Sequence, residues 1–217
     1  MKRRMIIFLV LSLFATSCSP LAPLPVHNKF FILSPISEAD GTITRLPLAQ
    51  QISVGVGPID FPDYLRRPEV VTRTAANRID VSQENRWAGP LDKNFTRVLS
   101  GNLATLLNTQ RVESYPWNRI TPVDYQVTVD VERFDTDTEK QAKLNARWSI
   151  RDGRDGKVLY ATETTASAPV GSGDEGPSAA LSSNIATLSK EIASQLTLLR
   201  GHPGGVLPSG SLVSGTN

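Results

Sequence analysis

The sequence predicts a single α+β domain, in which two long amphipathic helices pack a mixed, mostly antiparallel sheet of about seven or eight strands. Two observations predict this class. Segments 91–107 and 178–199 carry apolar side chains at helical spacing. Several shorter segments alternate apolar and polar residues with the period of two that is typical of strands. A three-layer α/β/α sandwich is one arrangement that these elements allow.

Each predicted helix has one continuous apolar stripe. In the first helix the stripe comprises Leu91, Phe95, Val98, Leu99, Leu103, Leu106 and Leu107. Asp92 lies in its first turn, where a negative charge suits the helix dipole, and Asn108 can end it. In the second helix the stripe comprises Leu181, Ile185, Leu188, Ile192, Leu196 and Leu199, and Pro177 is well placed to open the helix. Both stripes indicate helices that pack on a core.

The strands are expected in two groups. In the first half they lie at 29–33, at 51–59, and at 70–74 and 78–82, the last two forming a hairpin that closes near Ala76 and Asn77. In the second half they lie at 125–132, 144–151 and 157–165, with turn residues at 152–156 and a loop at 171–176. Residues 38–46 are polar and predict a surface loop.

The first seventeen residues have the parts of a signal peptide. Three basic residues at 2–4 precede an apolar run at 5–14, which is shorter than the roughly 20 residues of a membrane span. Ala-Thr-Ser-Cys at 15–18 resembles the bacterial lipobox, although Ala15 stands where leucine is more usual. We therefore expect an acylated Cys18, the alternatives being an ordinary cleaved signal or a retained anchor. Ser19 then favours export to the outer membrane.

The chain thus divides into four parts. Residues 1–17 form a lipoprotein signal peptide, 18–29 the acylated cysteine and a Pro-rich tether, 30–199 the folded domain, and 200–217 a disordered Gly/Ser/Pro-rich tail. Of the 23 basic side chains, three lie in the signal, so 20 remain against 21 acidic ones. This balance provides no basic stripe and excludes general nucleic-acid affinity.

The residues that usually carry chemistry are scarce. The chain has two histidines, His27 and His202, which lie in the tether and the tail, and one cysteine. No histidine-based catalytic set can form in the domain, so we expect no enzyme and no cofactor. Gly55 and Gly57 lack the third glycine and the following helix of a dinucleotide fingerprint. They indicate close backbone packing or a bulge instead.

A Pro-bounded segment at 61–68 is the strongest candidate for binding a partner. It combines aromatic and arginine side chains, which dominate binding hot spots; the candidate residues are Phe61, Tyr64, Leu65, Arg66 and Arg67, with Trp87 as a further one. The alternative is that Tyr64, Leu65 and Trp87 pack at the edge of the core and the arginines are solvated. The carboxylates at 130, 132, 135 and 137 could form a metal or acid pair, but a solvated face and a polar loop fit them better.

Three blocks of sequence resemble one family of bacterial lipoproteins. They are FFILSP at 30–35, VGVGPIDFPDYLRRPEVVTR at 54–73 and NRWAGPLDKNFTRVL at 85–99. Together with the lipobox, they are similar to the ABC-type transport auxiliary lipoprotein family, and most of all to its paraquat-inducible protein C type. The resemblance covers about residues 30–199, and the long tail departs from it.

This resemblance implies a function without catalytic residues. It implies an outer-membrane partner of an MCE-domain protein, which forms a periplasmic tunnel for lipids, and of that protein's inner-membrane partner. A homo-oligomer is compatible with the sequence. The alternative is a structural or assembly lipoprotein, such as a pilotin-like or envelope adaptor, that shares only the fold.

Overall fold

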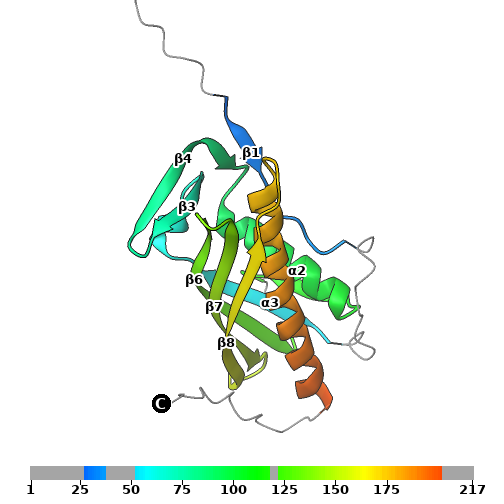
Figure 1. Ribbon diagram of the computed structural model, residues 1–217. Helices are drawn as coiled ribbons and strands as arrows, with labels where there is room; N and C mark the ends of the chain where they lie inside the picture. The colour runs from blue at the N-terminus through cyan, green and yellow to red at the C-terminus, as the bar shows by residue number, and fades with distance from the viewer. Residues whose placement is uncertain (1–26, 38–51, 118–121, 202–217) are drawn as a thin grey trace, which may run out of the picture.

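The computed structural model describes residues 27–37, 52–117 and 122–201 (Figure 1). Eight strands form one sheet: β1 (Lys29–Phe31), β2 (Val54–Asp60), β3 (Glu69–Ala75), β4 (Arg78–Trp87), β5 (Val112–Ser114), β6 (Tyr125–Asp137), β7 (Gln141–Asp152) and β8 (Val158–Pro169). The helices are α2 (Leu91–Leu106), α3 (Gly176–Gly201) and the 3-10 turn η2 (Asp63–Leu65). The α+β class, the single domain and both long helices are confirmed. Cys18, the loop at 38–46 and the tail beyond 201 lie outside the described residues.

Strand β6 is the centre of the sheet. Its first half pairs in parallel with β2, which continues to β5, and its end pairs in parallel with β3, which continues through β4 to β1. Its other edge pairs antiparallel with β7, and β7 pairs with β8. The sheet is therefore mixed, as predicted, and its longest ladders are antiparallel.

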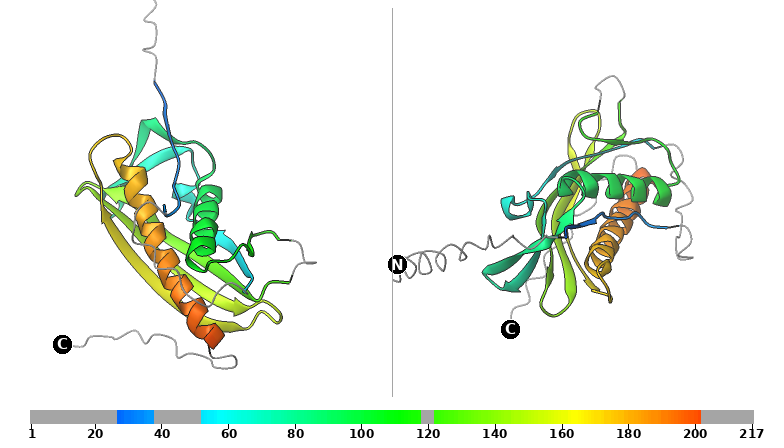
Figure 2. Two further views of the ribbon diagram at one scale, coloured as in Figure 1. Left: turned by 90° about the vertical axis from the view of Figure 1, so that its right-hand side faces the viewer. Right: turned by 90° about the horizontal axis from the view of Figure 1, so that it is seen from above.

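Both helices cover the same face of the sheet (Figures 1 and 2). Asn102 of α2 donates to Ser189 of α3 at 3.0 Å, and Glu191 of α3 accepts a hydrogen bond from Thr164, a buried residue of β8. Ser100 of α2 bonds Ser114 of β5 at 3.0 Å. The fold thus has two layers, and the three-layer sandwich that the sequence allowed is not formed.

The core lies between the helices and the sheet. The apolar stripes of both helices are buried there as predicted, and Leu103 has no exposed surface. The rings of Phe61, Phe95 and Phe134 meet nearly perpendicular to one another, with centroids 5.3 to 6.3 Å apart. Edge-to-face packing of this kind is the favourable geometry for aromatic rings. The residue that begins the 61–68 segment is therefore part of the core.

Several local predictions can be compared with the structure. The hairpin at 76–77 is confirmed, although β4 continues to Trp87 beyond its predicted end. Asn108 follows α2 with φ of 50°, a conformation that asparagine tolerates and that ends a helix. The three-residue strand β5 was not predicted, since so short a segment carries no periodic signal.

Candidate functional site

A groove lies between the 61–68 segment and the turn that leads from β4 into α2. It has a volume of about 590 Å³, and its lining includes residues 59–61, 65–68 and 87–92. Its floor is apolar, because Phe61, Leu65, Trp87 and Leu91 line it and are each at most 5% exposed. The structure therefore brings the two predicted partner-binding regions together around one surface, called the Arg67 groove below.

The two walls of the Arg67 groove are joined by the backbone. The N–H of Trp87 donates to the carbonyl of Pro68 at 2.6 Å, and the N–H of Ala88 donates to Phe31 at 2.9 Å. Inside the first wall, the N–H groups of Leu65 and Arg66 close the η2 turn on the carbonyls of Pro62 and Asp63. These bonds hold the groove in a fixed shape, which lowers the entropy cost of binding.

The two neighbouring arginines of the groove differ in their partners. Arg66 donates to the Asp60 carboxylate and, at 2.9 Å, to the carbonyl of Phe61. Arg67 is exposed and, within the described part of the chain, forms no ion pair or hydrogen bond. Arg66 therefore stabilises the 61–68 segment, whereas the guanidinium of Arg67 is exposed and, among the described residues, unpaired beside the apolar residues of the groove.

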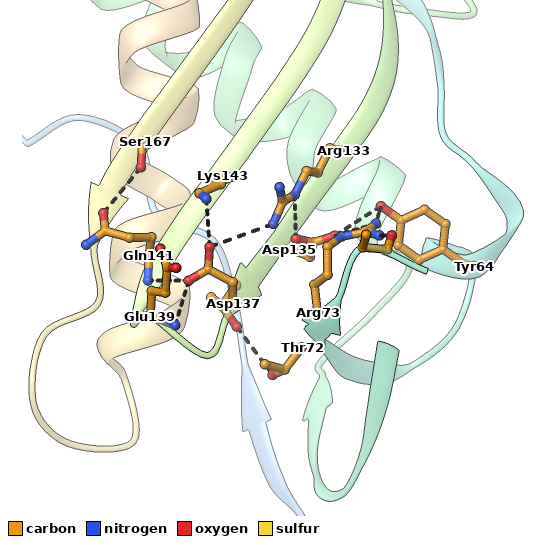
Figure 3. Close-up of polar contacts among 12 residues, drawn as sticks. Tyr64, Thr72, Arg73, Arg133, Asp135, Asp137, Glu139, Gln141, Lys143 and Ser167 are labelled. Carbon is orange, nitrogen blue, oxygen red and sulfur yellow. Dashed lines mark hydrogen bonds and ion pairs between the residues drawn. The ribbon is translucent and has the colours of Figure 1, made fainter. Parts of the chain in front are cut away.

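Tyr64 does not line the Arg67 groove. Its hydroxyl donates to Asp135 Oδ2 at 3.2 Å on the face of the sheet opposite α2 and α3 (Figure 3). The guanidinium carbon of Arg73 lies 5.7 Å from the centre of its ring. The 61–68 segment is thus held on both sides, by Phe61 and Leu65 in the core and by Tyr64 over β6.

The carboxylate of Asp135 is the centre of a buried ion network. Its side chain has no exposed surface, and it accepts hydrogen bonds from Arg73 Nε at 3.2 Å and Arg133 Nε at 2.8 Å (Figure 3). Burial is the largest single influence on the pKa of Arg73 and acts to lower it, but the charge of Asp135 and the hydrogen bonds to Tyr64 and Asp135 together raise that pKa. Burial raises the pKa of Tyr64, and the nearby Asp135 charge adds to the effect. Tyr64 is therefore a neutral donor and Arg73 a charged one.

Asp137 extends this network along β6. It accepts from Lys143 Nζ at 2.9 Å and from the backbone N–H groups of Glu139 and Gln141, each at 3.0 Å. Desolvation acts to raise the pKa of Asp137, but the hydrogen bonds from Lys143 and from the Gln141 backbone lower it overall. The network anchors the end of β6, and it needs no ligand to be satisfied.

The sequence assigned the four carboxylates at 130, 132, 135 and 137 to a solvated face and a polar loop. The solvated face is correct for Asp130 and Glu132, but the polar loop is wrong, because Asp135 and Asp137 lie in β6. Asp130 and Glu132 are exposed and both pair with Arg147 at 3.0 Å. Asp135 and Asp137 are covered, since β3 pairs beside this end of β6 and contributes Arg73, and the hydroxyl of Tyr64 bonds Asp135. Within the described ranges, no group of three or more potential ligands could hold a metal ion.

Gly55 and Gly57 have the packing role that the sequence predicted. A Cβ on Gly55 would lie 2.8 Å from the indole of Trp117, and one on Gly57 would lie 2.6 Å from Tyr115 Cβ. Gly57 also has φ of 121°, and the register between β2 and β6 shifts between Val56 and Ile59. These glycines let the Tyr115–Trp117 segment lie directly on β2.

Sequence reasoning missed the burial of Asp135 and the groove itself. The register of β6 against β7 shifts between Val131 and Arg133, so Phe134 enters the core and Asp135 faces the open side. A simple alternation from Val127 onward would have placed Asp135 inward. The arginines at 73 and 133 were the one sequence feature that could have indicated a buried, paired carboxylate. Nothing in the sequence, however, shows that β3 lies beside this end of β6.

Comparison with protein families identifies the class of protein. The chain matches the ABC-type transport auxiliary lipoprotein component family over residues 34–193. The chain therefore belongs to this family of auxiliary proteins of transporters, as the sequence resemblance implied. Among curated proteins, none matches the chain significantly.

Solved structures show the same fold at low sequence identity. Protein XCC0632 from Xanthomonas campestris is 16% identical with a TM-score of 0.64, over 80% of this chain and 97% of that one. An uncharacterized protein of known crystal structure is 20% identical with a TM-score of 0.63, over 78% of this chain and 99% of that one. At these identities the likeness supports the fold only. In the part of the chain that the structure describes, no helix is long and apolar enough to span a membrane.

Proposed function

We propose that this chain is a non-enzymatic outer-membrane lipoprotein that docks the periplasmic tunnel of an MCE-domain protein. In this proposal residues 1–17 are removed, Cys18 is acylated, residues 18–29 tether the domain at 30–199 to the periplasmic face of the membrane, and residues 200–217 form a tail. Membership of a lipoprotein family of transport auxiliary components supports it, as does the lipobox at 15–18. The domain takes part in lipid transport by binding, without a cofactor.

The observation that carries the docking proposal is the uncompensated Arg67 beside an apolar floor. Trp87, Phe61 and Leu65 are buried, so they shape the groove, whereas the exposed guanidinium of Arg67 can pair with a partner. Aromatic and arginine side chains around a preformed pocket are typical of binding hot spots. The chemistry fits a partner segment that inserts an apolar side chain and places a carboxylate near Arg67.

The direct test is Arg67→Glu in the full-length, membrane-anchored protein. This change reverses the charge of the exposed arginine of the groove, which has no ion pair or hydrogen bond among the described residues. We expect affinity for the MCE-domain protein, captured by crosslinking from native membranes, to fall at least about tenfold. The matched control is Arg154→Glu in the exposed turn between β7 and β8, which should leave capture unchanged.

Two outcomes would contradict this function. Wild-type capture by a folded Arg67→Glu variant would move the interface away from the groove. Recovery of a secretin or a peptidoglycan-associated protein, and of no MCE-domain protein, would favour the structural or assembly alternative. The anchor is tested separately: Cys18→Ser should abolish labelling by a fatty acid, and equal labelling of both proteins would refute acylation at Cys18.

A further inference from the structure

The N-terminal strand of the described domain presents two large apolar side chains to solvent. Phe30 is 65% exposed and Ile32 57% exposed, the highest values among the exposed large hydrophobic residues of the described ranges. They are two positions apart in an extended segment, so their side chains share one side. Phe31 and Leu33 point the other way, and Leu33 is fully buried.

The segment that carries these two exposed side chains is well fixed to the rest of the domain. Lys29 Nζ lies 2.7 Å from Asp174 Oδ2, and β1 pairs with residues 85–87 of β4. The carbonyl of Leu33 accepts from Arg97 Nη2 at 2.7 Å, and the N–H of Ile36 donates to Asn102 Oδ1 at 2.8 Å. The segment is therefore fixed on both sides of the two exposed side chains.

Phe30 and Ile32 form one wall of a second groove, and α3 forms the other. The groove has a volume of about 610 Å³, and the helix contributes the small residues Ala179, Ser182, Ser183 and Ala186. Glu175 and Lys190, which also line it, have opposite charges. The groove is therefore lined by a mixture of apolar and small polar side chains, and its two charged residues have opposite signs.

The position of Phe30 in the chain indicates what covers this surface. Phe30 follows Cys18 by twelve residues, so an acyl anchor at Cys18 would hold it within roughly 40 Å of the bilayer. Phenylalanine and aliphatic side chains enter the boundary between lipid headgroups and acyl chains favourably when they lie on a surface beside the membrane. Exposed apolar side chains on the one strand that follows the tether are suited to that boundary.

We propose that Phe30 and Ile32 insert into the membrane surface and orient the domain on it. The occupant of this face is a lipid surface. The inference rests on the anchor at Cys18 that forms part of the proposed function. The anchor supplies retention in the membrane, and the two side chains fix which face of the domain lies against it. Since the inserting side chains, Phe30 and Ile32, are uncharged, the contact persists at high salt.

The test measures lipid contact at position 32. In the mature protein Cys18 is acylated, and the sequence has no other cysteine, so Ile32→Cys can be labelled selectively with an environment-sensitive fluorophore. The full lipidated chain is reconstituted into vesicles of phosphatidylethanolamine and phosphatidylglycerol that contain brominated lipid as a quencher. The matched control is Val158→Cys, 42% exposed at the start of β8, at the other end of the molecule from β1 (Figure 1).

We expect the label at position 32 to shift its emission to the blue and to be quenched by brominated lipid at low and high salt. The label at position 158 should show neither effect, and adding Phe30→Ser should reduce the quenching at 32. An acylated protein whose label at position 32 is not quenched by brominated lipid would overturn the inference. Protection of that label by the MCE-domain protein would then assign this surface to the partner and would equally overturn it. A protein without acyl label at Cys18 would refute the anchor and, with it, this inference.

Discussion

Both halves of β6 place carboxylates on the face of the sheet opposite α2 and α3, but those of the first half are exposed and Asp135 in the second half is buried. In the first half, Asp130 is 53% exposed and pairs with Arg147, which is 61% exposed. In the second half, Asp135 is fully buried and is bonded by Arg73, Arg133 and Tyr64. The strand is continuous, and the neighbours differ: the first half pairs with β2, and the end pairs with β3, while Tyr64 lies over it.

This difference explains how the 61–68 segment is stabilised. Because Tyr64 is fixed to the buried Asp135, and Phe61 to the core, the 61–68 segment keeps its shape without a ligand. Arg67 remains exposed, as the proposed docking role requires. Exposed pairs such as Asp130–Arg147 contribute little to stability, whereas removing one partner from a buried ion pair leaves an uncompensated charge.

The largest loss of stability is expected from a change in the hydrophobic core, which both halves of β6 share. Leu103→Asp would place an unpaired charge in the fully buried face of α2, and it should unfold the domain by a cost of more than about 4 kcal/mol. Thermal unfolding followed by circular dichroism measures this. Unchanged stability would mean that α2 does not form the core that both halves share.

Removing the Asp135 carboxylate should disrupt the ion network of the buried half of β6 and leave the exposed half unchanged. Asp135→Ala leaves Arg73 and Arg133 without their shared carboxylate, and it should cost about 3–5 kcal/mol in urea unfolding. Asp130→Ala is the matched change in the exposed half, and it should cost no more than about 0.5 kcal/mol. Similar losses in the two variants would erase the distinction between the halves.

The acid dependence of stability should separate the halves further. The pKa of Asp137 is lowered in the folded protein, so its contribution is present above the unfolded-state pKa of about 4 and is lost as the pH falls through the lower folded value. Asp137→Asn should therefore destabilise the domain at pH 7 by about 1–2 kcal/mol. The difference in the free energy of unfolding between this variant and the wild type should become smaller below about pH 4. A difference independent of pH would contradict the ionised role of Asp137.

A small effect is expected from Tyr64, which links the buried half of β6 to the 61–68 segment. Tyr64→Phe removes the hydroxyl that donates to Asp135 but keeps the ring beside Arg73. Since Asp135 retains both arginines, the free energy of unfolding should fall by only about 1 kcal/mol. The variant should still capture the MCE-domain protein, because Tyr64 does not line the Arg67 groove. Loss of capture with full stability would assign Tyr64 to the interface itself.

Much of the fold follows from local patterns, but the site does not. The stripes of α2 and α3 and the alternation in β6 and β7 were sufficient to predict the elements and the α+β class. The burial of Asp135 depends on a register shift after Val131 and on the parallel pairing of β3 with the end of β6, neither of which has a local signal. The partner-binding region was predicted from residue type, but only the structure separates the buried Trp87 from the exposed Arg67.

The central claim, that the Arg67 groove receives the MCE-domain protein, is tested most directly by site-specific photocrosslinking in native membranes. A photoreactive amino acid at position 67 of the lipidated protein should yield a crosslinked species that contains the MCE-domain protein. The same amino acid at position 154 should yield none. Crosslinking of that partner at 154 and not at 67, or no such product at either position, would contradict the account.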